Sequence, residues 1–329
     1  MKIAVVILNW NGKKLLEQFL PSVIEHSKEA SIYVADNNSV DDSVSFLKIT
    51  YPLVKVIQNS INGGYAKGYN EALQTIEADI FCLLNSDVQV TKNWLAPIIK
   101  TFKANSSTSI IQPKILDYKQ KEYFEYAGAA GGFIDKYGYP YCRGRVFNTI
   151  EKDEGQFDDV TDIFWASGAC LFIRSAAFKS LNGFDETYFA HMEEIDLCWR
   201  AKNLGHNITY VGLSKVYHVG GATLHENNPT KTYLNFRNSL FTLTKNANGN
   251  LFTTILLRLL LDGIAGIKFL LELKLKHTLA IIHAHLSFYG SLPRLLKQRK
   301  DTKSKINYYQ IKSIVVAYFL KKKVIYNSL

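Results

Sequence analysis

The sequence begins with Ile3-Ala4-Val5-Val6-Ile7-Leu8, a short apolar run rich in β-branched residues, and then turns polar at Asn9-Trp10-Asn11-Gly12. Residues 13–27 follow, and their apolar side chains recur at the spacing of one helix face. The opening therefore predicts a strand, a loop at its carboxyl end and a helix.

The same alternation continues through the first half of the chain. Further strands are predicted at 32–35, 54–57, 80–84 and 109–115, and further helices at 43–48, 69–76 and 94–102. Strands separated by helices of this length form a parallel sheet with helices on both faces. We therefore expect an α/β fold with a doubly wound, mostly parallel sheet.

Ligands bind such sheets beyond the carboxyl ends of the strands. Here those ends carry four polar loops, at residues 9–12, 36–38, 59–64 and 85–87. Asn, Asp and Gly also form ordinary turns, but four such loops along one edge indicate a site.

Charge is distributed unevenly along the 329 residues, whose net charge is +10. Residues 251–329 hold 14 Lys and Arg against 3 Asp and Glu, so this tail carries +11 and the remainder about −1. A nearly neutral globule with a basic tail does not resemble a uniformly basic nucleic-acid-binding protein, so we expect no nucleic-acid partner. The four cysteines are scattered without a Cys-x-x-Cys pair, which suggests neither a disulfide framework nor a thiolate zinc site.

Two common phosphate-binding loops are absent from the sequence. The Rossmann GxGxxG pattern is missing after the first strand, where Gly12 stands alone. Gly63 and Gly68 have the spacing of a P-loop, but Tyr69-Asn70 follows where a P-loop needs Lys-Ser/Thr. These departures argue against a dehydrogenase and against a P-loop NTPase.

Eight segments carry a further pattern. They are residues 5–12, Val34-Ala35-Asp36-Asn37-Asn38-Ser39, residues 62–70, Leu83-Leu84-Asn85-Ser86-Asp87-Val88, residues 168–174, Gly183-Phe184-Asp185-Glu186, residues 193–200 and Tyr217-His218. In this order they resemble glycosyltransferase family 2, whose catalytic domain has the GT-A fold, and most closely its rhamnosyltransferase-like branch. The resemblance implies an inverting enzyme of bacterial surface polysaccharide synthesis. Its expected donor is dTDP-rhamnose or another dTDP- or UDP-sugar, and its expected acceptor is a glycan or a polyprenyl-linked glycan.

The resemblance assigns the nucleotide-sugar donor to the polar loops. Asp36 would contact the nucleobase, with Trp10 packed on the ring, and the two adjacent glycines would let the backbone approach the nucleotide closely. The residues expected to bind the donor are Asn9, Trp10, Asp36, Gly63, Gly64, Lys67, Asn70, Asn85 and Asp87.

A divalent cation, Mg²⁺ or Mn²⁺, is expected at Asp87 and His218. Asn85-Ser86-Asp87 stands where the family has its Asp-x-Asp motif, and hard cations take oxygen ligands beside substrate phosphates. Because Asn85 departs from the acidic form, we expect it to hold the ribose or an outer position. His218 matches a histidine that joins the metal in some GT-A enzymes.

The catalytic base is expected in the acidic cluster Glu193, Glu194 and Asp196. Neighbouring like charges raise one pKa toward neutrality, as a general base needs. The family's base is usually the second acid of a Glu-Asp pair, which falls on Glu194 although Asp is commoner there, and Asp196 is the alternative. Glu193 and a stacking Trp165 are expected to contact the acceptor. The departures at Asn85 and Glu194 leave a second reading open, a catalytically degenerate sugar-nucleotide or glycan-binding module.

Two parts are expected, a GT-A domain over residues 1–240 and a basic amphipathic helical tail over 241–329. Neither 251–271 nor 277–293 is a convincing membrane span, because the first carries charges and the second three histidines, a glycine and a proline. Apolar helices with interleaved Lys and Arg resemble segments that lie on an anionic membrane surface. The alternative is an oligomerisation unit, such as a homodimer interface. Without a signal peptide, we expect a cytoplasmic protein that is peripheral on the inner face of the plasma membrane.

Overall fold

Strand β1 (Ile3–Asn9) lies inside a sheet and pairs in parallel with β2 (Ala30–Asp36) on one side and β4 (Ile80–Asn85) on the other. Ile3, Val5 and Ile7 join one apolar layer, whereas Ala4 and Val6 join the other. A strand buried on both faces has no polar side to present, which explains its unbroken apolar run.

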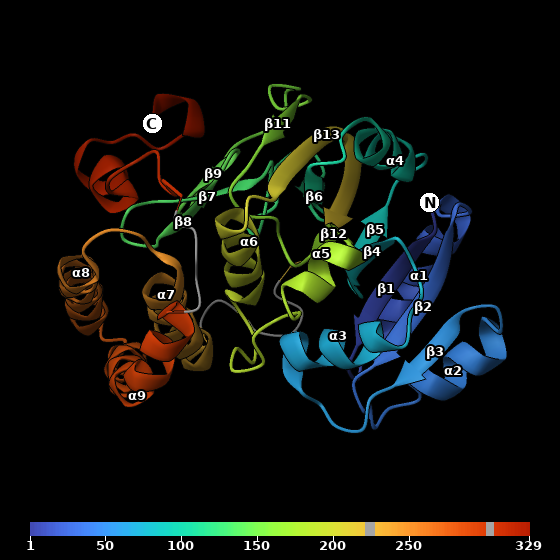
Figure 1. The fold of residues 1–329 in the computed structure, drawn as a ribbon, viewed down its shortest axis with the longest axis horizontal. Helices are drawn as coiled ribbons and strands as arrows, with labels where there is room; N and C mark the ends of the chain where they lie inside the picture. Colours follow the sequence, from blue (N-terminus) through green and yellow to red (C-terminus); the bar gives the residue numbers. More distant parts are fainter. Residues whose placement is uncertain (221–227, 301–305) are drawn as a thin grey trace.

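The computed structural model describes residues 1–220, 228–300 and 306–329. Within them, the main sheet has the strand order β11-β13-β6-β12-β4-β1-β2-β3, with β5 paired to β13 (Figure 1). The remaining strands of this sheet are β3 (Lys55–Gln58), β5 (Val88–Val90), β6 (Thr108–Asp117), β11 (Val160–Asp162), β12 (Cys170–Arg174) and β13 (Asn207–His218). Strand β12 runs antiparallel between β4 and β6, so the sheet is mixed but mostly parallel in its first half.

Helices cover both faces of the sheet. The layer that contains Val5 also holds side chains of α1 (Lys13–His26), α2 (Ser43–Thr50) and α4 (Leu95–Ala104). The layer that contains Val6 holds side chains of α3 (Gly64–Gln74), α5 (Ser175–Ser180) and α6 (Glu193–Asn203). The prediction of a doubly wound α/β sheet is therefore confirmed.

A second, smaller sheet was not predicted from the sequence. Its strands are β7 (Gly132–Ile134), β8 (Pro140–Cys142), β9 (Arg145–Val146) and β10 (Thr149–Ile150), which pair antiparallel in sequence order. This sheet is joined to the main body by a bridge between Gly132 and Trp165.

The C-terminal part consists of α7 (Pro229–Asn246), α8 (Leu251–Leu271), α9 (Leu275–Lys300) and the short helical turns η1 (Val316–Leu320) and η2 (Tyr326–Ser328). The three long helices lie together at one end of the molecule, and the chain then returns to the small sheet (Figure 1). The ring of Tyr308 packs 4.5 Å from that of Trp199 in α6. None of the helices that the structure describes is long and apolar enough to cross a bilayer.

Candidate active site

The loops after β1 and β2 are tied together by side chains. Asn9 and Asp36 stand in register at the carboxyl ends of these parallel strands. Asn9 Nδ2 donates to Asp36 Oδ1 (3.0 Å) and to Ser39 Oγ (3.3 Å), and the Ser39 N–H donates to Asp36 Oδ2 (2.9 Å). Asp36 is therefore buried with both oxygens hydrogen-bonded. Trp10 is 49% exposed, so its indole lies at the surface of this loop.

Three asparagines without a predicted role join the second loop to the third. Asn37 Nδ2 donates to Asn62 Oδ1 (3.0 Å) and to the carbonyl of Gly64 (2.9 Å). Asn59 Nδ2 donates to Asn37 Oδ1 and to the carbonyl of Gly68, both at 3.0 Å. This network fixes the start of α3 against the carboxyl end of β2.

Gly64, which follows Gly63 at the start of α3, lies close to the loop that precedes α6. Its φ of 72° is in the left-handed region that favours glycine. A Cβ here would collide with the carbonyl oxygen of Phe189, which also accepts the N–H of Tyr65 (3.0 Å). The close approach at Gly64 is therefore made by the protein's own backbone.

Two residues expected at the donor have partners within the protein. Asn70 Nδ2 donates to the carbonyl of Phe184 (2.9 Å), and Asn70 Oδ1 accepts the N–H of the same residue (2.9 Å). Lys67 Nζ lies 3.6 Å from Glu71, one helical turn away, and remains about a third exposed. Asn70 thus holds the loop after α5, whereas Lys67 is partly exposed beside Glu71.

Asp87 and His218 meet at the edge of the sheet. Asp87 lies in the turn between β4 and β5, and His218 ends β13, which pairs with β5. His218 Nε2 is 3.1 Å from Asp87 Oδ1 and 3.5 Å from Asn85 Nδ2, and both Asp87 and His218 are almost fully buried. Burial alone raises the pKa of Asp87, but the His218 charge and hydrogen bond outweigh it and lower that pKa.

Glu125 stands behind His218 and was not predicted from the sequence. Its Oε1 is 3.4 Å from His218 Nδ1, and its Oε2 accepts the N–H of Ala127 (2.6 Å). Burial by itself lowers the pKa of His218, but Glu125 and Asp87 outweigh burial and raise it to about 10. No motif surrounds Glu125, so only the fold reveals its place beside His218.

Asp87 and His218 fit a divalent cation as its two protein ligands. A carboxylate oxygen and an imidazole nitrogen face each other, and a carboxylate behind the far ring nitrogen is the usual support of a metal-bound histidine. That far nitrogen, Nδ1, is buried and makes no well-aligned hydrogen bond to any described residue. Among the side chains that the structure describes, no group of three or more His, Cys, Asp or Glu is arranged to hold a metal ion. The remaining ligands would have to come from substrate phosphates and water.

Glu193 and Glu194 open α6 after two residues in the left-handed region, His191 and Met192 (φ 68° and 73°). One oxygen of each glutamate, Oε2, is buried without a hydrogen-bond partner in the part of the chain that the structure describes. Burial raises the pKa of Glu194 to about 7. Burial and the neighbouring Glu194 charge raise the pKa of Glu193 well above its usual range. Glu194 thus titrates in the range of a general base.

Contacts lead from these glutamates toward the turn that holds Asp87. Tyr65, whose pKa is raised by burial and then by Tyr69, Glu193 and Glu194, donates to the carbonyl of Gly168 (2.8 Å). The next carbonyl, that of Ala169, accepts the N–H of Asn85 (3.0 Å) at the end of β4, two residues before Asp87.

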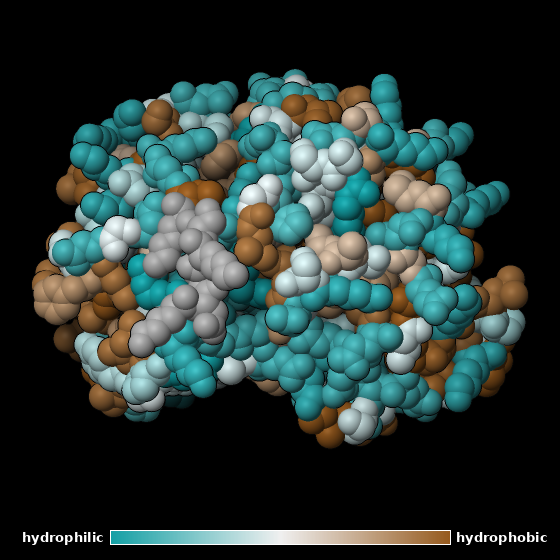
Figure 2. Space-filling view, viewed as in Figure 1, coloured by the Kyte–Doolittle hydropathy of each residue, from teal (hydrophilic) through white to brown (hydrophobic). Residues whose placement is uncertain are grey.

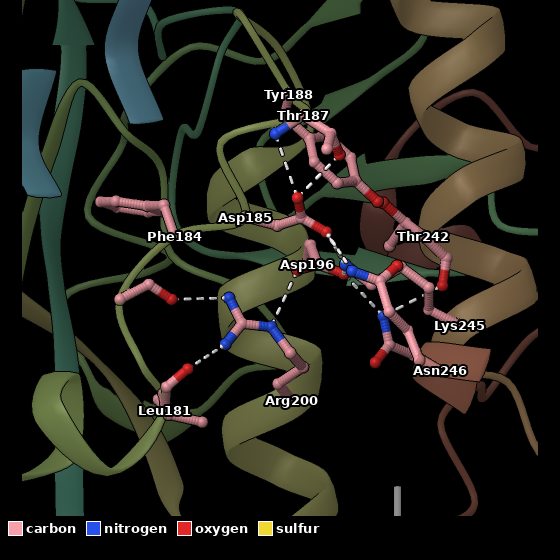
Figure 3. Close-up of polar contacts among 12 residues, drawn as sticks. Leu181, Phe184, Asp185, Thr187, Tyr188, Asp196, Arg200, Thr242, Lys245 and Asn246 are labelled. Atoms are coloured by element: carbon pink, nitrogen blue, oxygen red, sulfur yellow. Dashed lines mark hydrogen bonds and ion pairs between the residues drawn. The ribbon is translucent and has the colours of Figure 1, made fainter. Parts of the chain in front are cut away.

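Asp196 is occupied by structural contacts (Figure 3). Its Oδ2 lies 2.8 Å from Arg200 Nε, and its Oδ1 lies 2.9 Å from Lys245 Nζ and accepts a hydrogen bond from Asn246 Nδ2 (2.8 Å). Lys245 also bonds Asp185 Oδ2 at 2.7 Å. Burial raises the pKa of Asp196, but Lys245 and Arg200 outweigh it, so the net shift is downward. Both oxygens of Asp196 are therefore engaged, whereas one oxygen of Glu194 has no hydrogen-bond partner among the described residues.

Trp165 lies in the core. Its side chain is 3% exposed, its ring packs against Gly132, and its Nε1 donates to the carbonyl of Phe133 (2.8 Å). The expected stacking platform for an acceptor sugar is thus replaced by an anchor for the small sheet.

Comparisons with known proteins identify the family of the chain. A family model described as glycosyl transferase family 2 matches residues 4–181. The N-acetylglucosaminyl-diphospho-decaprenol L-rhamnosyltransferase of Mycobacterium tuberculosis is 25% identical over 231 residues, which cover 66% of this chain and 75% of that protein. The low-salt glycan biosynthesis hexosyltransferase Agl10 of Haloferax volcanii is 23% identical over 286 residues, covering 84% and 87%. Rhamnosyltransferase WbbL of Escherichia coli is 23% identical over 219 residues, covering 64% and 80%.

Solved structures share the fold. A crystal structure of GalNAc-T7 with UDP, GalNAc and Mn²⁺ superposes with a TM-score of 0.66 at 16% identity, covering 98% of this chain and 57% of that longer chain. A structure of S. aureus TarS residues 1–349 with UDP-GlcNAc gives a TM-score of 0.57 at 17% identity, covering 91% and 84%. The expected GT-A fold, extended by C-terminal helices, is confirmed.

Proposed function

The chain belongs to glycosyltransferase family 2, and on that premise we propose that it is an inverting glycosyltransferase. It moves a sugar from a nucleotide-diphosphate donor to a glycan acceptor. The observation that carries this proposal is the pairing of Asp87 with His218 at the sheet edge. The unpartnered oxygen of the buried Glu194 supports it.

The donor occupies the loops at the carboxyl ends of the strands. Trp10 covers the nucleobase. Asp36, which Asn9 and Ser39 hold in place, offers the base a carboxylate oxygen as a hydrogen-bond acceptor. Asp87 and His218 would hold Mg²⁺ or Mn²⁺, and Glu125 would orient His218. When bound, the cation offsets the negative charge of the departing nucleoside diphosphate.

Glu194 acts as the general base. Its unpartnered oxygen accepts the proton of an acceptor hydroxyl while that hydroxyl's oxygen forms a bond to the anomeric carbon. The bond from this carbon to the diphosphate oxygen breaks on the opposite face, and the bonding pair leaves with the diphosphate. A direct displacement of this kind inverts the configuration at the anomeric carbon and needs no enzyme nucleophile.

The relatives guide the choice of substrates. Two of them are rhamnosyltransferases, and the name of one specifies a diphospho-decaprenol substrate. We therefore take dTDP-rhamnose as the first donor to test and a polyprenyl-linked glycan as the first acceptor. A lipid-linked acceptor places the enzyme at the inner face of the plasma membrane.

The test is release of nucleoside diphosphate from a panel of sugar nucleotides with Mn²⁺ or Mg²⁺. We expect one donor to be turned over, and we expect Asp87→Ala and Glu194→Gln to abolish or strongly reduce turnover. Glu77→Gln, at an exposed position, is the matched control. Donor binding without turnover, unchanged by Glu194→Gln, would instead identify a sugar-nucleotide-binding module.

A further inference from the structure

Helix α8 presents its polar residues inward and its apolar residues outward. Its buried side chains are Thr254, Arg258 and Asp262, with Gly266 on the same face. Arg258 Nε bonds Asp262 Oδ1 (2.7 Å), which also accepts the hydroxyl of Tyr139 (2.7 Å). An amphipathic helix of a globular protein normally shows the reverse arrangement.

The outward side of α8 is a continuous apolar stripe. Leu256, Leu260, Ile264, Ile267 and Leu271 follow one another at helical spacing and are 46–79% exposed. At the end of the molecule where α8 lies in Figure 1, the space-filling view shows hydrophobic side chains at the surface (Figure 2).

The stripe continues across the turn into α9. Leu275, Leu279, Ile282 and Leu286 repeat at helical spacing and are 49–62% exposed. Between the helices, Leu273 is 85% exposed and has a φ of 59°, a conformation uncommon for leucine. Solvated apolar surface of this extent normally marks an interaction site.

Basic side chains border this surface. Lys268, Lys274 and Lys276 lie at the α8–α9 turn and are exposed. Glu272 in the same turn lies 2.8 Å from Lys274 Nζ and 3.8 Å from Lys268 Nζ, so the net charge of these four side chains is positive but reduced. Lys268 Nζ lies 5.6 Å above the ring of Phe319, so the exposed pair Lys321-Lys322, which follows η1, is close to the end of α8. Apolar side chains bordered by lysines match the acyl chains and anionic headgroups of a lipid surface.

We propose that the outward sides of α8 and α9, with the turn between them, form a docking face for an anionic membrane surface. The helices lie in the plane of the lipid headgroups and do not span the bilayer. A second copy of this chain is a poorer occupant, because pairing would bring together two segments that each carry +11.

This inference deepens the proposed function by specifying how the enzyme reaches a lipid-linked acceptor. Only the biological role of membrane binding rests on the proposed function, because the binding itself can be measured without any turnover.

The experiment is flotation of the full-length protein with phosphatidylcholine vesicles, with and without phosphatidylglycerol. The test variant is Leu260→Ser/Ile264→Ser/Ile267→Ser, which removes exposed apolar side chains without adding charge. Its matched control is Val40→Ser/Ile49→Ser/Leu53→Ser, at residues that are 81–94% exposed on the opposite part of the fold. A charge variant, Lys274→Gln/Lys276→Gln, tests the lysines.

We expect the wild type and the matched control to float with anionic vesicles. Partitioning of the apolar variant should fall by at least about tenfold, and that of the charge variant by about fivefold per lysine. Unchanged melting temperatures and donor turnover in solution would show that both variants are folded and competent.

Three results would overturn the proposal. The first is no flotation of the wild type, and the second is equal flotation of the wild type and the apolar variant. The third is a wild-type protein that forms a dimer and does not bind vesicles, with the apolar variant monomeric. The last result would identify a second copy as the occupant. A protein that floats but turns over no donor would contradict the proposed function and leave this inference intact.

Discussion

At the scale of single residues, two opposing effects act on the pKa of the Glu194 carboxylate. It lies in the first turn of α6, where the helix dipole favours a negative charge. Burial acts in the opposite direction and prevails, because the pKa is raised to about 7. The side chain therefore exchanges its proton near neutral pH.

Replacing Glu194 with Gln should separate activity from stability. We expect turnover to fall by about 10²–10⁴-fold, the usual contribution of a general base. The pKa of Glu194 is about 7 in the folded protein and 4.5 in the unfolded chain. Between these two values the folded protein keeps a proton that the unfolded chain has released, so the protein loses stability as pH rises toward 7. Urea unfolding at pH 8 should therefore show Glu194→Gln to be more stable than wild type. Equal stability together with full activity would contradict this assignment.

The wild-type rate should have an acidic limb near pH 7. Glu194 must be ionised to accept a proton, so kcat should rise with pH up to that point and then level off. A pH–rate profile with the preferred donor checks this, and a limb near pH 4 would point to Asp196 or another carboxyl with a low pKa.

Glu125 should tune the cation site without contacting the substrate. Removing a carboxylate behind a metal-bound histidine typically weakens metal affinity by about 10–100-fold. We expect Glu125→Ala to show this loss in Mn²⁺ titrations followed by electron paramagnetic resonance in the presence of UDP. The exposed Glu122, as Glu122→Ala, is the neighbouring control. Identical Mn²⁺ affinities for the two variants would remove Glu125 from the site.

At the scale of elements, a buried ionic network fastens α6 to α7. Lys245 lies between Asp185 and Asp196, and its side chain is 5% exposed (Figure 3). Burial alone would raise the pKa of both carboxyls, but the Lys245 charge contributes to a net lowering. Their stabilisation is therefore present above about pH 4 and is lost as pH falls below it.

Lys245→Met should destabilise the protein by about 3–5 kcal/mol, because two buried carboxylates lose a partner. The deficit should shrink below pH 4, where protonation neutralises the carboxyls. Urea unfolding at pH 7 and pH 3.5 measures both effects, with the exposed Lys48→Met as control. A deficit that does not depend on pH would show that packing, and not charge, dominates at Lys245.

The elements that the sequence predicted share one property: their pattern is local. The strands β1 and β4 are unbroken apolar runs, and α1 has a regular apolar face. In contrast, β9 is only two residues long, and α3 begins at Gly64, a residue that weakens helix prediction. Trp165 was assigned by its residue type and Asp196 by its place in the acidic cluster, whereas the burial of both depends on distant partners such as Phe133 and Lys245.

At the scale of the whole molecule, the C-terminal part packs against the rest of the fold. Helix α7 runs through residue 240, and Tyr308 packs on Trp199 of α6. The Ile314 N–H donates to Asp135 Oδ2 (2.9 Å), and the Tyr318 hydroxyl is 2.9 Å from that of Thr149. These contacts join the end of the chain to helix α6 and to the small sheet.

Truncation after residue 245 should therefore destabilise the remaining protein by exposing core side chains. We expect a lower melting temperature and aggregation, in contrast to the unchanged melting temperature of the serine variants on α8. Differential scanning calorimetry compares them, and a truncated protein that melts like wild type would show that residues 1–245 fold independently.

The outward-facing leucines and isoleucines of α8 also bear on how the enzyme would find its acceptor. A protein held on the same lipid surface as a polyprenyl-linked substrate searches by lateral diffusion in two dimensions. Its rate would then follow the mole fraction of acceptor in the vesicle and would fall on dilution with inert lipid, even when the bulk concentration stays constant.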